Sequence, residues 1–528
     1  EKLHQMLNYW DLPDSNLFKD LCNPIDEQEV RNAIFSTSSK KSPGEDGLSI
    51  AAYKLLENHL ITLTECLQNM FLKGTVPSSW KRGIIVLIFK KGEQNDISNY
   101  RPITLLNNDY KLLCKILATR LNRFITDIIP NYQIGFMPKR LIFDNVITLD
   151  HLLSNSTKVL NLDFKKAYDS VSHDSIEIIL QHLKFPEQFV KIVRGLLSES
   201  TAKLIVNGEH TEPFQVERGV KQGDPLSPLL FTFAVELLAR CANDKQMLNK
   251  FPYIGKIKVS HIMYADDTCL FSTDEDGLNR WFIHLDNLKQ ATGLEVNMQK
   301  TFTIHQKLDT LKLLEEDEEF TYLGFEFNSK GIIDSYDRIV EKTIKSIEDK
   351  TNPSMNIFMK LCVLKGYMLP KITYKGFLLG KNYPNLDNAI SEFLWSTYGG
   401  SKRTLVSKDR RVQPLCHGGL GIPPSLYRAN SLGANMFERI VFNKEMKAYQ
   451  LINLKEINLR KLAYSKCKKI SQSKIIQSLF VKWRATVPDE ENSYYGENNE
   501  IDHFSKYHTV QEIQFIYIKK CLADKFYY

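Results

Sequence analysis

The chain is organised around the stretch His261–Phe271, which reads HIMYADDTCLF. Two apolar runs flank the adjacent acids Asp266 and Asp267, and this pattern predicts a strand, a tight turn and a second strand with both acids at the tip. Adjacent carboxylates in apolar surroundings repel each other and are costly to desolvate, and a divalent cation would remove that cost. An exposed hairpin tip with two solvated acids is the other interpretation, because short motifs match by chance.

A second acidic stretch, Val159–Val171, reads VLNLDFKKAYDSV, and Asp163 ends its apolar, strand-like run. The 103 residues from Asp163 to Asp266 are ample for two strands to return side by side. The two carboxylates would then form a site for two Mg²⁺ ions, since Mg²⁺ takes one or two carboxylates together with phosphate oxygens. Two such ions can hold the attacking and the leaving oxygen of an in-line phosphoryl transfer.

Length and composition limit the class of protein. The chain has 528 residues, 43% of them hydrophobic, so we expect several subdomains with a real core. It begins at Glu1 without a signal peptide, which we interpret as a fragment or a processed product. Apolar stretches such as Leu229–Ala239 are shorter than the roughly 20 residues of a membrane span. The nine cysteines lie at least 28 residues apart, so we expect free thiols and no zinc site built on CxxC.

The net charge of +7 is unevenly distributed. Residues 401–484 hold 18 Lys and Arg against 4 Asp and Glu, a balance of +14, so the remainder sums to −7. A basic block suits a polyanion such as nucleic acid, although a solvated helical surface is the common alternative. The candidate nucleic-acid-binding residues are Lys402, Arg403, Lys466, Lys468, Lys469 and Lys474.

Periodicity gives a coarse order of elements. The pattern predicts helices at Ile25–Phe35, Ala51–Leu72, Leu112–Ile128, Ser175–Leu183, Pro186–Leu197 and Leu278–Thr292. It predicts strands at Ile84–Phe89, Ala202–Val206, Phe214–Glu217 and Phe320–Phe325. From Ser335 to about Trp395 the pattern is mostly helical, with interruptions at Pro353, Pro370 and Pro384.

Eight strings stand in a fixed order: KSPGEDG, YRPITL, QIGF, LDFKKAYDSV, GVKQGDPLSPLLF, YADD, LEVNMQKT and YLGF. Together they resemble a reverse transcriptase, and NYRPITLLN and QGDPLSPLLF resemble the LINE-type, non-LTR retrotransposon branch most closely. The resemblance runs from about Ile25 to Phe325, with looser similarity to about Asn430. It implies an α+β fold, the right-hand polymerase of fingers, palm and thumb, with a mostly helical C-terminal extension.

The resemblance also implies a domain order. We expect an N-terminal extension or linker at 1–24, reverse transcriptase fingers and palm at 25–330, and a helical thumb at 331–400. A basic nucleic-acid-binding region would follow at 401–528.

Roles for single residues follow where the motifs match. The resemblance makes Asp163 and Asp266 metal ligands, with the backbone carbonyl of Phe164 as an oxygen ligand, and Asp267 a further member of the motif. Arg101 and one of Lys90 and Lys91 would hold the triphosphate, because Arg pairs with phosphate oxygens and Lys acts as a mobile point charge. Gln222 would lie against the incoming nucleotide, Lys300 would approach the leaving pyrophosphate, and Tyr168 would exclude ribonucleotides. Surface charge is the alternative for each of these Lys and Arg residues.

We therefore expect an RNA-directed DNA polymerase that takes an RNA template, a DNA primer or target and dNTPs, uses two Mg²⁺ (Mn²⁺ can replace them), and binds neither zinc nor membrane. Target-primed reverse transcription and a nuclear and cytoplasmic location are implied by the branch. A group II intron maturase is the runner-up, and a non-catalytic RNA-binding scaffold is the alternative of another class. No endonuclease, zinc knuckle or ribonuclease H carboxylate set is evident, so we expect target cleavage to come from outside this stretch.

Overall fold

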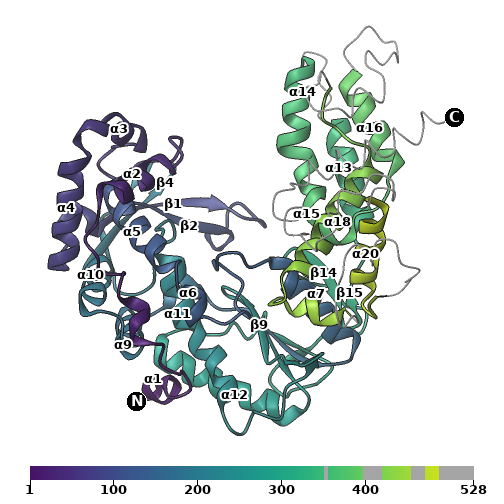
Figure 1. Ribbon diagram of the computed structural model, residues 1–528, viewed down its shortest axis with the longest axis horizontal. Helices are drawn as coiled ribbons and strands as arrows, with labels where there is room; N and C mark the ends of the chain where they lie inside the picture. The colour runs from purple at the N-terminus through teal and green to yellow at the C-terminus, as the bar shows by residue number, and fades with distance from the viewer. Residues whose placement is uncertain (350–354, 396–418, 453–469, 487–528) are drawn as a thin grey trace, which may run out of the picture. The chain divides into compact units, whose positions relative to one another are not determined.

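The computed structural model describes residues 1–349, 355–395, 419–452 and 470–486 (Figure 1). The chain divides into two compact units, and each unit combines segments that are separated in the sequence. Unit 1 comprises residues 1–142, 157–252 and 259–315, and unit 2 comprises residues 143–156, 253–258 and 316–528. Within the described residues, no helix is both long enough and apolar enough to cross a membrane.

All segments of unit 1 contain helices. Several of these helices begin or end at residues that are typical of helix ends. Helix α2 starts with a capping box formed by Asp26 and Glu29, and α4 ends at Gly74, whose φ of 65° suits a residue without a Cβ. The helices of unit 1 are α1 (Lys2–Leu7), α2 (Glu27–Phe35), α3 (Ile50–Leu55), α4 (Leu60–Lys73), α5 (Asn108–Leu121), α6 (Ile125–Ile128), α8 (Ala167–Ser170), α9 (His173–His182), α10 (Glu187–Leu197), α11 (Ser227–Arg240) and α12 (Glu275–Thr292).

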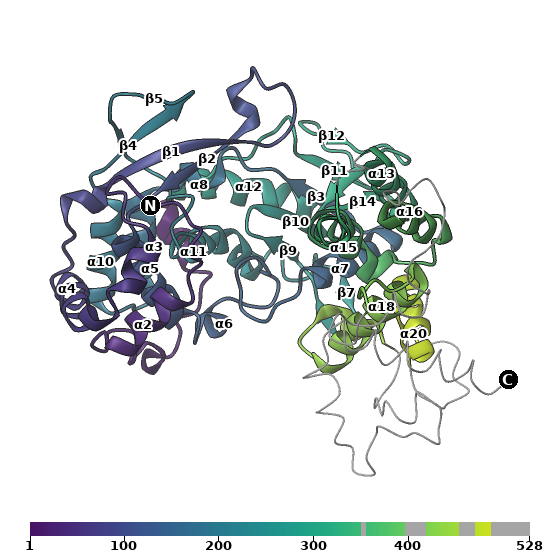
Figure 2. The ribbon, with the colours of Figure 1, turned by 90° about the horizontal axis from the view of Figure 1, so that it is seen from above.

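Two sheets organise unit 1. One contains β1 (Arg82–Phe89), β2 (Tyr100–Leu105), β4 (Ser200–Val206), β5 (Glu209–His210) and β6 (Phe214–Val216), in the order β2-β1-β4-β5 with β6 also on β4. The other contains β3 (Lys158–Leu162), β9 (His261–Tyr264), β10 (Asp267–Ser272), β11 (Phe302–Ile304) and β12 (Lys312–Leu313). Its order is β12-β11-β3-β10-β9, which can be followed in Figure 2, and α12 packs against β3 and β10.

The core of unit 1 is one continuous hydrophobic cluster that takes side chains from Leu3 to Leu311. Residues 1–24, expected to be an extension or a linker, are part of it. Leu3, Met6, Leu7 and Trp10 recur at helical spacing and are buried, and α1 packs against α9, α11 and α12. The short amphipathic run is therefore a structural element of this unit, because its apolar face has a surface to cover.

Unit 2 is mainly helical and has a core of its own. Its helices are α7 (Ile142–Ser154), α13 (Tyr336–Asp349), α14 (Ile357–Val363), the π-turn Leu364–Met368, α15 (Leu369–Leu379), α16 (Pro384–Trp395), α18 (Ser425–Phe442) and α20 (Lys474–Thr486). Its strands are β7 (Tyr253–Ile254), β8 (Ile257–Lys258), β13 (Phe320–Tyr322), β14 (Phe325–Asn328) and β15 (Gly331–Ile332).

Both units also contain short 3₁₀ turns. Those of unit 1 lie at Ser15–Phe18, Glu57–His59, Ser78–Lys81, Ile97–Asn99 and Cys241–Asn243, and Lys447–Leu451 lies in unit 2.

Three predicted elements differ from the observed ones. The single strand expected at Phe320–Phe325 is a hairpin, because Leu323 and Gly324 adopt φ of 48° and 79° and turn the chain between β13 and β14. The single helix expected at Ala51–Leu72 is divided into α3 and α4 by a 3₁₀ turn at Glu57–His59. The predicted strands at Ile84–Phe89 and Ala202–Val206 and the remaining predicted helices are present, with ends shifted by a few residues and the Leu112–Ile128 helix interrupted between α5 and α6.

Candidate active site

The hairpin predicted for the Asp-Asp stretch is present. Strands β9 and β10 are antiparallel and are joined by Ala265 and Asp266, and Asp267 opens β10 opposite Tyr264. Ala265 has a φ of 56°, an uncommon conformation for a residue with a Cβ. Its N–H donates to Oε1 of the buried Gln133 at 3.0 Å, which holds the turn in place.

Strand β3 brings the second acidic stretch beside this turn. Leu162 pairs with Thr268 in the antiparallel register of β3 and β10, so Asp163 follows at the level of Asp267. The backbone of Asp163 is fixed on its other side: its carbonyl accepts from the N–H of Asn297 at 2.6 Å, and its N–H donates to Oγ1 of Thr301 at 3.2 Å. The structure therefore brings together the two acidic stretches that the sequence singled out.

Lys300 belongs to the same tether. It lies between Asn297 and Thr301, and its Nζ is 4.0 Å from Oδ2 of Asp163. Both side chains are largely exposed, so the pair is an open contact and not a buried ion pair. This places a mobile cation beside the first carboxylate.

The ionised forms of the two hairpin carboxylates are disfavoured by their surroundings. Asp266 and Asp267 are accessible to solvent, yet the protein around them is close enough that desolvation raises the pKa of both. The neighbouring acids add to this effect: Asp163 raises the pKa of Asp266, and Asp266 and Asp163 raise the pKa of Asp267, which reaches about 6. Such a group of acids favours a bound cation.

Two cations from the other sheet of unit 1 act on the same acids. Arg101 lies on β2 and Lys90 directly follows β1, where its N–H donates to the carbonyl of Asn99 at 2.9 Å. The charges of Lys90 and Arg101 lower the pKa of Asp266, against the larger effect of desolvation, and Lys90 does the same for Asp267. Lys91 is exposed, and its charge is not among the causes of these shifts.

The loop that carries Gln222 is fastened at both ends. The N–H of Val220 donates to the carbonyl of Tyr168 at 2.8 Å, and the N–H of Thr104 on β2 donates to the carbonyl of Gln222 at 2.7 Å. The side chain of Gln222 donates to Asp169, whose pKa is raised by burial against this bond and the charge of Lys166. Gln222 is thus held between the Tyr168 segment and the strand of Arg101.

Tyr168 has a ring with a fixed plane. It stacks on the fully buried Phe231 with centroids 4.5 Å apart and an interplanar angle of 14°. Burial, and then the charges of Asp266 and Tyr264, raise the pKa of its phenol. Its hydroxyl is buried and has no hydrogen-bond partner among the described residues.

A comparison with known families decides between the possible identities of this site. Residues 88–327 match the family described as reverse transcriptase (RNA-dependent DNA polymerase). This segment, somewhat less than half of the chain, is a reverse transcriptase domain by this match. The matched segment includes every site residue described above, from Arg101 to Lys300, together with Lys90 and Lys91.

The chain has relatives among proteins of mobile elements. It is 33% identical over 285 residues to the transposon TX1 uncharacterized 149 kDa protein of Xenopus laevis, covering 53% of this chain and 22% of that protein. It is 29% identical over 378 residues to the Pol polyprotein from the type-1 retrotransposable element R2 of Popillia japonica, covering 66% of this chain and 51% of that protein. The chain thus spans about half or less of the length of these relatives.

Among solved structures, the chain is similar to apo telomerase from Candida tropicalis truncated from its C-terminal domain, with a TM-score of 0.36 and 15% identity. This likeness covers 54% of this chain and 60% of the telomerase chain.

Reverse transcriptases use divalent metal ions, and the donors of this site can be compared with that need. In the described part of the chain, no three or more His, Cys, Asp and Glu side chains converge into a group that could hold a metal ion by themselves. Mg²⁺ does not require such a cage, because it is commonly bound by one or two carboxylates together with substrate phosphates and water. The raised pKa values of Asp266 and Asp267 fit a site completed by cation and substrate.

Three residues of the site were not singled out from the sequence. Gln133 supports the turn that carries Asp266, Asp169 holds Gln222, and Phe136 lies within ring contact of Tyr168 and Tyr264. All three stand inside strings that the sequence analysis quoted, QIGF and LDFKKAYDSV. Their roles depend on contacts between residues that are 32 to 132 positions apart, so only the fold reveals them.

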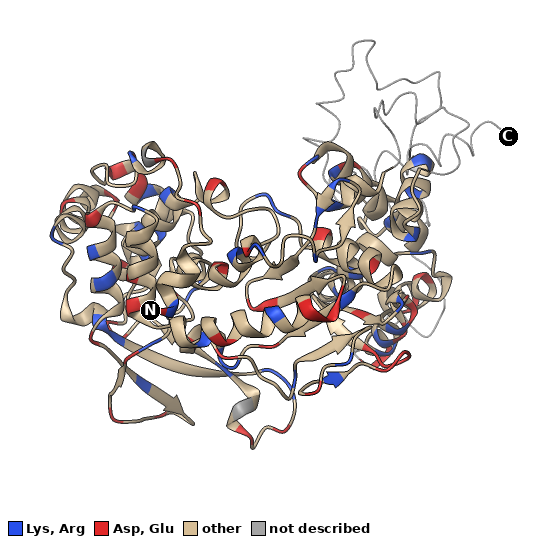
Figure 3. Ribbon diagram, turned by 90° about the horizontal axis from the view of Figure 1, so that it is seen from below, with Lys and Arg blue, Asp and Glu red and all other residues tan. Residues whose placement is uncertain are grey.

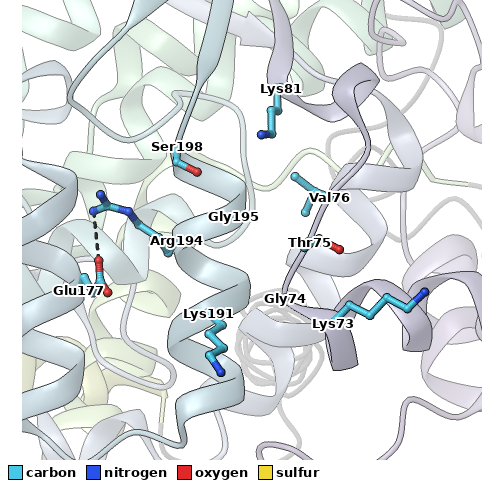
Figure 4. Close-up of a pocket in the computed structure, with 10 residues that line it drawn as sticks. All are labelled: Lys73, Gly74, Thr75, Val76, Lys81, Glu177, Lys191, Arg194, Gly195 and Ser198. Atoms are coloured by element: carbon cyan, nitrogen blue, oxygen red, sulfur yellow. Dashed lines mark ion pairs between the residues drawn. The ribbon is translucent and has the colours of Figure 1, made fainter.

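A pocket of about 330 Å³ in unit 1 is separate from this set (Figure 4). It is lined by Lys73, Gly74, Thr75, Val76, Lys81, Glu177, Lys191, Arg194, Gly195 and Ser198, none of which is a predicted site residue. Three of its cations already have acidic partners: Arg194 pairs with Glu177 and Asp174, Lys191 with Glu187, and Lys81 with Glu199. Acidic and basic residues are likewise interspersed over the described helices in Figure 3.

Most of the candidate nucleic-acid-binding residues lie outside the described part of the chain. Lys402, Arg403, Lys466, Lys468 and Lys469 fall there, and Lys474 is an exposed residue at the start of α20.

Proposed function

We propose that this chain catalyses RNA-directed DNA synthesis by extending a primer 3′-hydroxyl on an RNA template with dNTPs. The observation that carries the proposal is the meeting of Asp163 with Asp266 and Asp267 at neighbouring strand ends, within electrostatic reach of Lys90 and Arg101. Acids that hold cations beside basic groups that hold phosphates are the two parts that phosphoryl transfer needs.

The acids divide the work at the reacting centre. Asp163, Asp266 and the carbonyl of Phe164 would hold the divalent ions, and Asp267 adds negative charge next to them. When bound, two Mg²⁺ neutralise the charge that develops on the attacking and leaving oxygens. The protein supplies the fixed positions of these ligands, so little reorganisation is needed as the reaction proceeds.

The cations act on the triphosphate. Arg101 would pair with its oxygens, and Lys90 would add a mobile charge from the next strand of the same sheet. Lys300, beside Asp163, would hold a proton near the leaving pyrophosphate. Of the two neighbouring lysines, Lys90 is the better candidate for contacting the triphosphate. Its charge lowers the pKa of the hairpin acids, whereas the charge of Lys91 is not among the causes of those shifts.

Two further residues would face the nucleotide itself. Gln222 would lie against it, with its amide oriented by Asp169, and Tyr168 would lie under its sugar. The printed names of the relatives refer to retrotransposable and transposon elements. On that basis we extend the proposal to a non-LTR element enzyme that starts synthesis from the 3′ end of a DNA target.

Primer extension on an RNA template with Mg²⁺ tests the proposal. Asp163→Asn and Asp266→Asn should each lower DNA synthesis by about 100-fold or more, because a preorganised charge at the reacting centre is lost. Binding of the RNA template should be largely unchanged. Synthesis at more than a tenth of the wild-type rate by either variant would contradict the assignment.

Asp286→Asn is the matched control. Asp286 is an exposed acid of the same unit, on α12, and its carboxylate accepts a hydrogen bond from Gln290 one turn away. The same chemical change there should leave both synthesis and RNA binding unaltered.

A further inference from the structure

The loop Gln133–Phe136 is built onto the catalytic hairpin. The N–H of Ile134 donates to the carbonyl of Met263 at 2.9 Å, and the N–H of Met263 donates to the carbonyl of Tyr132 at 3.0 Å. Oε1 of Gln133 accepts from the N–H of Gly135 and from that of Ala265, both at 3.0 Å. The loop and the turn that carries Asp266 therefore share one hydrogen-bond network.

This contact is too close for another residue at position 135. A Cβ on Gly135 would lie 2.5 Å from the backbone nitrogen of Ala265, which no real contact allows. The loop is also braced from outside: Arg140 donates to the carbonyls of Pro130 and Gln133, and the hydroxyl of Tyr132 donates to the buried Glu236 at 2.6 Å. So many restraints fix the backbone of the next residue.

That next residue, Phe136, is held at a cost. Its φ of 62° is unfavourable for a bulky residue, and 45% of this apolar side chain is exposed. Strained backbone persists only where its surroundings over-determine it, and it gathers at functional sites. The ring of Phe136 lies 6.4 Å from that of Tyr168 at an angle of 76°, and 6.4 Å from that of Tyr264.

We propose that Phe136 is a positioning residue of the sugar gate, which restrains the ring of Tyr168 through a contact additional to its stacking on Phe231. This inference rests on the proposed function, and in particular on Tyr168 as the residue under the sugar. A ring stacked on one neighbour only can tilt, and a tilted gate leaves room for a 2′-hydroxyl. The edge-to-face contact between Phe136 and Tyr168 restricts that tilt.

Single-nucleotide incorporation of dNTP and rNTP measures the effect. Phe136→Ala should lower the ratio of kcat/KM for dNTP over rNTP by about two- to tenfold, which corresponds to about 0.4–1.4 kcal/mol, the usual worth of one aromatic pair. Phe136→Tyr retains the ring and should retain the ratio. Phe136→Gly relieves the backbone strain but removes the ring, and should behave as Phe136→Ala does.

A double-mutant cycle separates positioning from direct contact. In a Tyr168→Ala background, Phe136→Ala should change the ratio no further, because the gate through which it acts is gone. Equal effects of Phe136→Ala in both backgrounds would mean a direct contact with substrate and would overturn the inference. An unchanged ratio in Phe136→Ala, with wild-type thermal stability, would overturn it as well; should that variant fold poorly, Phe136→Leu provides the same comparison with an apolar side chain of similar size.

The proposed function has its own outcome in the same assay. If the wild-type chain incorporates no dNTP with Mg²⁺, the polymerase assignment fails. If the wild type incorporates dNTP in an Asp163-dependent manner and the ratios do not move, only the role of Phe136 fails.

Discussion

Tyr168 is the residue on which nucleotide selection should depend. Its ring is stacked on Phe231, and its buried hydroxyl has no partner among the described residues. We expect Tyr168→Phe to keep the discrimination against rNTPs and to be no less stable, because an unpaired buried hydroxyl contributes nothing that its removal would lose. Tyr168→Ala should accept rNTPs far better, because the loose pocket that it leaves can reject an added hydroxyl by only about 100-fold.

Incorporation of rNTP and dNTP by the three proteins, with a melting curve for each, checks this expectation. An active, folded Tyr168→Ala protein with unchanged discrimination would place the gate at another residue. A marked loss of stability in Tyr168→Phe would mean that the hydroxyl has a partner after all.

At the same scale, motif residues could be predicted from the sequence and their supports could not. Asp163, Asp266 and Lys300 belong to strings that indicate their chemical roles, and the fold brings these residues together. Gln133 was quoted only as part of the QIGF string and was given no role, although its side chain is fully buried and holds Ala265, 132 residues away. A polar side chain in a loop gives no sign of burial until the partner strand is known.

At the scale of elements, α18 and α20 bury a carboxylate that should make unit 2 sensitive to pH. Glu438 on α18 accepts one hydrogen bond, from Nε1 of Trp483 on α20 at 3.1 Å, and desolvation raises its pKa to about 7. In the unfolded chain its pKa is ordinary, so between about pH 4.5 and 7 the folded state holds the extra proton. The stability of this unit should therefore fall as the pH rises through that window and stay lowered above it.

Glu438→Gln should remove this dependence. We expect the variant to melt above the wild type at pH 8, by up to about 3 kcal/mol in unfolding free energy, and near it at pH 5. Thermal unfolding followed by circular dichroism at the two pH values measures the difference. Glu392→Gln, at an exposed site on α16, is the control; an equal response of both variants would mean that burial of Glu438 is not the cause.

Elements with a strong period were predictable, and those set by a single backbone angle were not. The helical face repeated from Leu112 onward, and the Asp-Asp hairpin, are present much as the pattern indicates. The turn at Leu323–Gly324 was missed because Leu323 adopts a positive φ that its residue type disfavours. That turn is imposed by the pairing of β13 with β14, which the local sequence does not contain.

At the scale of the whole molecule, the two units are not consecutive in the chain. The domain boundaries at 24, 330 and 400 assume continuous segments and remain predictions, whereas the compact units exchange segments. Helix α7 lies in the sequence between the QIGF string and the strand of Asp163, yet it belongs to unit 2 with residues 316–528. The periodicity of a sequence can indicate that a helix is buried, but it does not indicate which core contains that helix. The exchange of segments between the two units therefore could not be predicted.

Helix α7 is an internal part of unit 2. Nearly all of its residues from Phe143 to Leu153 are buried. The carboxylate of Asp144 accepts from Nζ of Lys447 at 3.2 Å and from the N–H of Ala448 at 2.8 Å, and Asp150 accepts from the N–H of Ile332 at 2.9 Å. Without α7, the buried Lys447 would lose its ion pair with Asp144, and the N–H of Ile332 on β15 would lose its acceptor, Asp150.

We therefore expect residues 316–528 alone to lack a cooperative unfolding transition. The same fragment with residues 142–156 joined to its N-terminus by a long Gly/Ser linker should regain one, because the linker restores α7 at a modest entropic cost. In this fusion Asp144→Ala should cost about 3–5 kcal/mol, since it breaks the buried ion pair between Asp144 and Lys447. Adding Lys447→Met should recover a large part of that loss, because the buried positive charge is then removed as well. Urea unfolding of the four proteins measures each step. A cooperative transition in the fragment without α7, or an Asp144→Ala fusion as stable as its parent, would show that unit 2 is complete without this helix.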